Sequence, residues 1–181
     1  KSTYTRMFLE EYKKKYKERE IYLFSSLKED ESLDKIKPKR FKICDELWKD
    51  PIKVDELAES VVIFDDIDNI TNKRQKEAVY DILNNILEVG RHHKITCIVT
   101  MHLPTNGRET RRILNEAHAC VDFPHSAGGK IKYLLQEYLD IDKQMIRYFK
   151  QCHSRWCCIF KNYPMAYMLE HEIGMLNTAD S

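Results

Sequence analysis

This sequence has no long apolar run, few glycines and almost no net charge. No stretch of the 181 residues approaches the roughly 18 apolar residues of a membrane helix, so we expect no membrane span. The formal net charge of +1 limits any contact with nucleic acid to local patches. The five glycines include no glycine-rich phosphate-binding loop. With 43% hydrophobic residues, the chain is expected to form one domain over residues 1–181.

The six cysteines do not form the framework of a small secreted domain. Cys152-His153 and Cys157-Cys158 come nearest to a metal-binding cluster. However, neighbours on a strand point to opposite faces, and this spacing fits no common zinc module. We therefore expect free thiols that behave as small hydrophobes.

Segments with helical and strand-like patterns alternate along the chain. Helices are expected over 3–17, 71–89, 109–118, 130–138 and 142–152. Strands are expected over 21–24, 61–64, 95–101, 119–123, 156–160 and 165–170. This alternation is typical of an α/β fold with a mostly parallel sheet and helices on both faces. The last two strands are expected to form a terminal hairpin, within a carboxy-terminal elaboration over residues 130–181.

The run from Val61 to Phe64 is continuously apolar and three of its four residues are β-branched, which predicts a strand buried on both faces. Asp65 and Asp66 follow directly. Ligands of open α/β sheets bind beyond the carboxyl ends of the strands, so both acids are expected at a site. An apolar strand that ends in two acids is the Walker B pattern of nucleotide hydrolases. Asp65 would associate with Mg²⁺, usually through water, and Asp66 would orient the attacking water.

Lys1-Ser2-Thr3 opens the chain and leads directly into a predicted helix. Together with the Walker B strand, these residues match the end of a P-loop, whose pattern is G-x-x-x-x-G-K-[ST]. Lys1 would contact the β- and γ-phosphates of ATP, Ser2 would ligate Mg²⁺, and the helix amino terminus with Thr3 would bind the anion. We expect the glycine-rich loop and the strand feeding it to precede Lys1.

Two further residues are candidates for roles in hydrolysis. His102 ends a second apolar strand, where a polar side chain can sense the γ-phosphate; a structural histidine is the alternative. Arg91 lies in Gly90-Arg91-His92-His93 and is a candidate for an arginine that reaches a neighbouring subunit's nucleotide; cations at a helix end are the alternative. The competing arginines are Arg74, Arg108, Arg111 and Arg112.

These motifs occur in an order that resembles one group of proteins. The pieces are Lys1-Ser2-Thr3, Val61 to Asp66, Gly90 to His93 with Ile95 to His102, Leu114 to Ala117, and Val121 to Pro124. They look like the genome-packaging ATPases of large double-stranded DNA viruses, the poxvirus-like and giant-virus members of the FtsK–HerA superfamily. The resemblance covers residues 1 to about 126.

The resemblance implies a RecA-like P-loop core in which the strand ending in His102 lies between the P-loop strand and the Walker B strand. It also implies Mg-dependent ATP hydrolysis by a homo-oligomeric ring, with an arginine supplied in trans. Such a ring moves double-stranded DNA, without sequence preference, into a preformed capsid. Expected partners are therefore DNA and a capsid or portal-vertex protein, in the host cytoplasm or the virion.

Other functions remain open at this point. A cellular or plasmid DNA pump belongs to the same superfamily. A small nucleotide kinase, a nucleotide switch or a non-catalytic P-loop scaffold would use the same motifs differently. The basic stretch from Lys35 to Lys42 is either a solvated segment or a surface that contacts DNA phosphates. Arg108, Arg111 and Arg112 form a second candidate surface for DNA.

Overall fold

The computed structural model describes residues 1–102, 107–125 and 130–176. The chain divides into two compact units, Lys1–His102 and Leu103–Ser181. The expectation of one domain over residues 1–181 stays a prediction. Among the described residues, no helix combines the length and apolar character needed to cross a bilayer.

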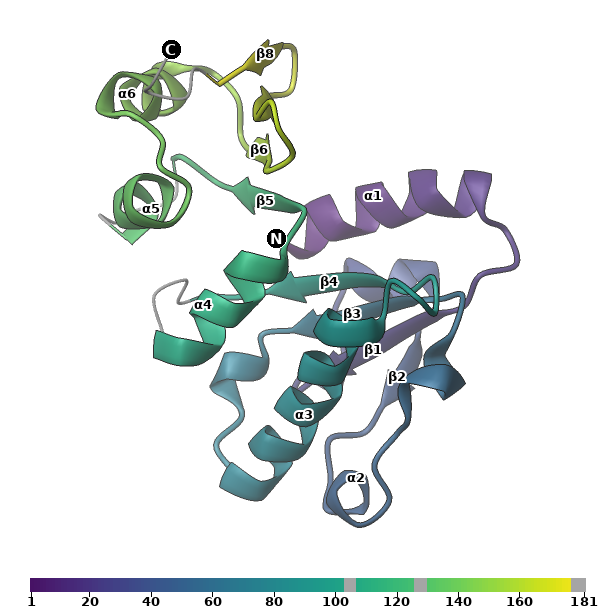
Figure 1. Cartoon of the computed structure of the whole chain (residues 1–181). Helices are drawn as coiled ribbons and strands as arrows, with labels where there is room; N and C mark the ends of the chain where they lie inside the picture. The colour runs from purple at the N-terminus through teal and green to yellow at the C-terminus, as the bar shows by residue number, and fades with distance from the viewer. Residues whose placement is uncertain (103–106, 126–129, 177–181) are drawn as a thin grey trace. The chain divides into compact units, whose positions relative to one another are not determined.

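The first unit is built on a four-stranded parallel sheet in the order β2-β1-β3-β4 (Figure 1). Its strands are β1 (Ile21–Ser25), β2 (Lys39–Phe41), β3 (Val61–Asp65) and β4 (Thr96–Thr100). All five residues of β3 are buried, as the continuous apolar run predicts. The predicted parallel α/β architecture is therefore confirmed for this unit.

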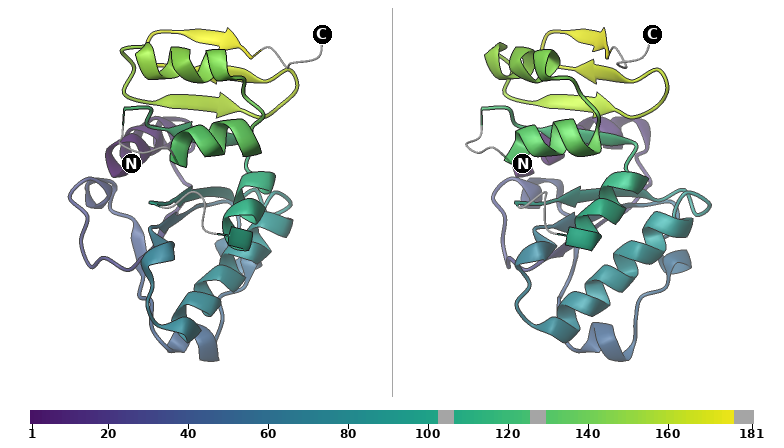
Figure 2. Two further views of the ribbon diagram at one scale, coloured as in Figure 1. Left: turned by 90° about the vertical axis from the view of Figure 1, so that its left-hand side faces the viewer. Right: turned by 60° about the vertical axis from the view of Figure 1, so that its left-hand side comes forward.

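Helices cover both faces of this sheet. The helix α1 (Ser2–Lys15) buries Leu9 against Ile21, Leu23 and Ile63 on one face. Along the other face runs α3 (Lys73–Val89), whose buried residues recur at helical spacing (Figure 2). The side chain of Asn72 caps the start of α3 by accepting the backbone N–H groups of residues 74 and 75.

Short elements complete the first unit. These are α2 (Glu46–Lys49) and the 3₁₀ turns η1 (Leu33–Ile36), η2 (Val54–Leu57) and η3 (Ile67–Asn69). Strand β2 lies inside the basic stretch, where the sequence predicted no element. Its three residues pair with β1 at the edge of the sheet, and Phe41 stacks on Phe24 with ring centroids 4.7 Å apart.

The second unit contains an antiparallel sheet in the order β5-β6-β7-β8. Its strands are β5 (Ala119–Asp122), β6 (Cys157–Phe160), β7 (Ala166–Met168) and β8 (Ile173–Met175). Its helices are α4 (Gly107–Glu116), α5 (Lys130–Tyr133), the π-helix η4 (Leu134–Tyr138) and α6 (Lys143–Gln151). The expectation of a mostly parallel sheet therefore holds for the first unit and not for this one.

The predicted terminal hairpin is part of this second sheet, and β8 was not foreseen. The core gathers Phe149, Ile159 and Tyr167 with leucines of η4 and the segments around it. All six cysteines are free thiols, as expected. Burial raises the pKa of the Cys120 thiol to about 11, which makes it unreactive near neutral pH.

Candidate functional site

Three neighbouring strands of the first unit end in polar side chains at the same level. The register pairs Ser25 with Asp65 across β1 and β3, and Asp65 with Thr100 across β3 and β4. All three residues are buried. Because the carboxyl ends of parallel strands meet at one edge, the pairing of β1, β3 and β4 brings these side chains together.

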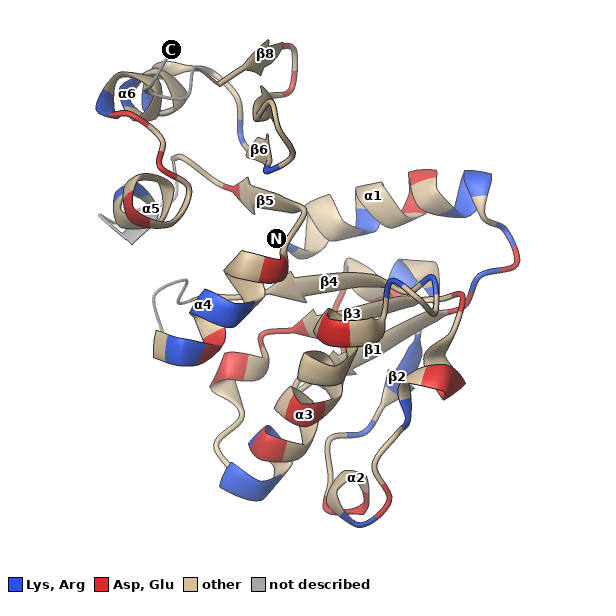
Figure 3. Cartoon of the chain, viewed as in Figure 1, with Lys and Arg blue, Asp and Glu red and all other residues tan. Residues whose placement is uncertain are grey.

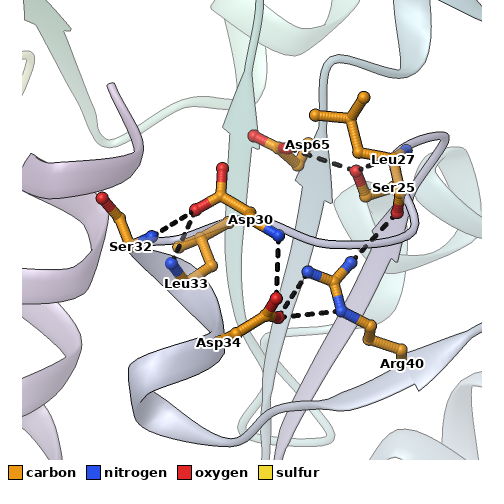
Figure 4. A network of polar contacts seen from close by, with 8 residues as sticks. All are labelled: Ser25, Leu27, Asp30, Ser32, Leu33, Asp34, Arg40 and Asp65. Carbon is orange, nitrogen blue, oxygen red and sulfur yellow. Dashed lines mark hydrogen bonds and ion pairs between the residues drawn. The ribbon is translucent and has the colours of Figure 1, made fainter.

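Two hydroxyl groups hold the Asp65 carboxylate. The Thr100 hydroxyl donates to Oδ1 at 2.6 Å. The Ser25 hydroxyl donates to Oδ2 at 3.2 Å, as Figure 4 shows. Asp65 is only 2% exposed, so these bonds replace much of the water that a carboxylate would otherwise bind. They fix the direction of both oxygens before any ligand arrives.

Asp66 turns the chain out of the sheet. Its φ of 49° lies in the left-handed region, which aspartate tolerates better than most residues. Its backbone N–H donates to the carbonyl of Thr100 at 3.2 Å, so pairing between β3 and β4 continues through the turn. The Thr100 hydroxyl lies 3.4 Å from Asp66 Oδ1, so it contacts both carboxylates, and the other partners of Asp66 differ from those of Asp65.

Two basic side chains meet the Asp66 carboxylate. The Nζ of Lys1 forms an ion pair with Oδ1, and Nε2 of His102 lies 2.8 Å from Oδ2. The side chain of His102 is 58% exposed, whereas that of Asp66 is 15% exposed. Residues 1, 66 and 102, far apart in sequence, therefore converge at the carboxyl edge of the sheet.

The amino terminus of α1 lies at the same edge, because Lys1 immediately precedes the helix. The first backbone N–H groups of a helix have no partner inside it, and the helix dipole adds partial positive charge there. Ser2 begins this first turn, and Thr3 Oγ1 lies 3.4 Å from Ser32 Oγ. Among the described residues, no group of three or more His, Cys, Asp and Glu side chains forms a metal cluster.

Arg91 lies away from these carboxylates. It follows α3 in a turn that leads into β4, at the amino end of that strand. His102 and the acids lie at the carboxyl end, about 16 Å along a five-residue strand. Arg91 therefore lies too far away to contact these carboxylates in the same chain. Arg108, Arg111 and Arg112 belong to α4 of the second unit.

Ser25 and Asp68 also lie near this edge of the sheet and were not predicted from the sequence. Ser25 follows the apolar run from Ile21 to Phe24 in the way that Asp65 follows its own run, and that repeated pattern was the available signal. Both carboxylate oxygens of Asp68 are buried, and neither has a hydrogen-bond partner among the described residues. Its main-chain carbonyl accepts the Lys76 ammonium at 2.9 Å.

Comparison with known proteins gives one clear relative. The uncharacterized protein V3 of Sputnik virophage is 40% identical over 174 residues, which cover 94% of this chain and 70% of the virophage protein. No family model matches the sequence. No solved structure matches it either.

Proposed function

The chain belongs to the family of the uncharacterized protein V3 of Sputnik virophage, and on that premise we propose that it is the ATPase core of a motor that packages double-stranded DNA into a viral capsid. The observation that carries the proposal is the convergence of Lys1, Asp66 and His102 beside the buried Asp65. A lysine at a helix amino terminus, close to acids at the end of a buried strand, is the arrangement that P-loop NTPases use to hold the phosphates and Mg²⁺ of ATP.

The residues present fit Mg²⁺ bound mainly by phosphates and water. Asp65 presents a buried carboxylate whose direction is fixed, and Ser2 lies in the first turn of α1. Mg²⁺ keeps several of its waters and needs few protein ligands, so the absence of a dense acidic cluster among the described residues agrees with it. When bound, the ion would neutralise phosphate charge.

In this structure the Asp66 carboxylate is paired with the Lys1 ammonium and lies within hydrogen-bond distance of His102. Phosphate oxygens would compete for the Lys1 ammonium, because they are strong acceptors with a higher local charge. Withdrawal of Lys1 would leave the Asp66 carboxylate free to accept a proton from the attacking water and to orient it. His102, which lies beside the other carboxylate oxygen of Asp66, would sense the same withdrawal of Lys1.

We propose that the glycine-rich loop is fed by a strand that pairs with β4. Strand β4 forms one edge of the sheet in the described part of the chain. Its sequence, Thr-Cys-Ile-Val-Thr, is nevertheless as apolar as that of a central strand. Its first four residues are only partly buried. A strand added there would arrive at Lys1 and place β4 between the P-loop strand and β3, the order of a RecA-like core.

Several parts of the proposal concern partners. Subunits would form a ring, with Arg91 reaching the nucleotide of the next subunit, since it cannot reach its own. The ring would act on DNA and a capsid or portal-vertex protein, in the host cytoplasm or the virion. A virophage relative supports this setting.

The ATPase rate of the full-length protein, measured with and without duplex DNA at rising salt, tests this function. We expect stimulation at low salt that falls steeply as salt rises, because phosphate contacts depend on counterion release. The variant Asp66→Asn is measured in the same assay. Its matched control is Asp81→Asn, on the exposed side of α3. Phosphoryl transfer to a nucleoside monophosphate without DNA stimulation would favour a kinase. Absence of nucleotide binding would favour a scaffold.

A further inference from the structure

The basic stretch from Lys35 to Lys42, here called the basic edge, forms a charged margin of the first unit. It contains five cations and no carboxylate. It includes the end of η1 and the edge strand β2, which carries basic residues in Figure 3. The side chain of Lys39 is exposed and lies 3.1 Å from that of Glu20. Lys35, Lys37 and Lys42 are also exposed.

Arg40 differs from the other cations of the basic edge because it turns inward. Its Nε and Nη2 donate to one oxygen of Asp34 at 3.0 and 2.5 Å, and its Nη1 donates to the carbonyl of Leu27 at 3.2 Å (Figure 4). Asp34 also accepts the backbone N–H of Asp30 at 2.8 Å. These two donors, Asp30 first and Arg40 second, lower the pKa of the Asp34 carboxyl, so the pair stays ionised at neutral pH. Arg40 therefore holds the loop after β1 at two points.

The same loop reaches the candidate site. The backbone N–H of Leu27 donates to the Ser25 hydroxyl at 3.2 Å, and that hydroxyl donates to Asp65 Oδ2 (Figure 4). The Leu27 carbonyl thus accepts a hydrogen bond from Arg40, and the Leu27 N–H donates one to Ser25. The Leu27 side chain is 52% exposed, so polar bonds rather than apolar burial fix this part of the loop. A continuous set of hydrogen bonds joins the basic edge to the carboxylate.

We propose that Arg40 transmits contact with a DNA backbone phosphate from the basic edge to Asp65. The inference rests on the function proposed above. A phosphate offers Arg40 two oxygens in the geometry that a guanidinium prefers, and so competes with Asp34 and with the Leu27 carbonyl. Release of Leu27 frees the Ser25 hydroxyl to leave Asp65 Oδ2. Asp65 would then have an oxygen free to hold Mg²⁺ through water, and hydrolysis would accelerate.

This coupling must be reciprocal. If DNA at the basic edge favours Mg-ATP at Asp65 by some factor, Mg-ATP raises the affinity for DNA by the same factor. Lys39 offers a matched control, because it lies on the same strand and carries the same charge but contacts Glu20 rather than the loop. A purely electrostatic surface would treat Lys39 and Arg40 alike.

The experiment compares Arg40→Gln, Asp34→Asn and Lys39→Gln in the full-length protein, with a blunt duplex of mixed sequence as the probe. For each variant, the ATPase rate is measured without DNA and at saturating DNA. We expect duplex DNA to raise the ATPase rate of wild-type protein and of Lys39→Gln by the same factor. For Arg40→Gln and Asp34→Asn, the basal rate should rise and the stimulation should fall to about one.

Asp34→Asn also guards against a folding defect of Arg40→Gln, because it leaves the arginine in place and keeps a side-chain oxygen that can accept the backbone N–H of Asp30. The inference is overturned if both variants keep the wild-type basal rate and stimulation. It is also overturned if Lys39→Gln loses stimulation at saturating DNA as they do. A wild-type protein that hydrolyses ATP without any response to DNA would instead contradict the proposed function.

Discussion

Replacement of Thr100 by valine tests how the Asp65 carboxylate is held. The two side chains have nearly the same shape, so the change removes a hydroxyl without leaving a cavity. That hydroxyl donates to Asp65 at 2.6 Å in a buried environment. A hydrogen bond to a charged group contributes roughly 1.5–3 kcal/mol, and the free energy of unfolding should fall by that amount. The change also removes longer contacts of this hydroxyl with the N–H and Oδ1 of Asp66, at 3.3 and 3.4 Å, while the Asp66 N–H keeps its bond to the main-chain carbonyl of residue 100.

Urea denaturation measures this loss as a shift in midpoint at constant slope. Thr96→Val is the control, because Thr96 lies on the same strand and its hydroxyl contacts the neutral Tyr12 hydroxyl at 3.3 Å. That change should cost only about 0.5–1.5 kcal/mol. If Thr100→Val costs no more than Thr96→Val, the hydroxyl of Thr100 does not hold a charged carboxylate and this account of the site is wrong.

Three further changes test other parts of the structure. Mixing Arg91→Ala subunits with Asp66→Asn subunits should restore some ATPase activity if arginine acts in trans, and a mixture no more active than its components would count against this. Burial raises the pKa of the Asp122 carboxyl from 3.8 to about 7; between these values the native protein holds more protons than the unfolded chain, so its stability falls as pH rises. In thermal melts, Asp122→Asn should therefore be more stable than wild type at pH 8 and lose that advantage near pH 4. Gly174→Ala would place a methyl group 2.5 Å from the Tyr167 ring and should cost about 1–3 kcal/mol in urea denaturation; an unchanged midpoint would contradict this packing.

Much of the first unit follows from local patterns. Helical spacing of apolar residues predicted α3 to within two residues at its start, and Asn72 explains that start as a cap. The run from Val61 to Phe64 predicted β3 because a strand buried on both faces needs apolar residues throughout. Convergence of Asp65 with the end of β4 follows from parallel pairing of the two strands.

Other features depend on contacts that no local pattern encodes. Strand β2 is short and basic, and it exists because Phe41 stacks on Phe24 at a sheet edge. Pairing of Ala119 with Phe160 joins segments 41 residues apart, so the antiparallel register of the second sheet was not readable from sequence. The link from Arg40 to Ser25 passes through backbone groups of a loop, whose path is set by side-chain hydrogen bonds.

Single-turnover hydrolysis of Mg-ATP by the full-length protein tests the central claim most directly. The claim is that Lys1, Asp65 and Asp66 form a nucleotide site in which Asp66 orients the attacking water. Asp66→Asn should bind Mg-ATP as wild type does and lose hydrolysis by about 10²-fold or more, since it removes a contact needed only in the transition state. Asp65→Ala should weaken Mg-dependent binding itself. Hydrolysis of Mg-ATP by Asp66→Asn at the wild-type rate would contradict the account.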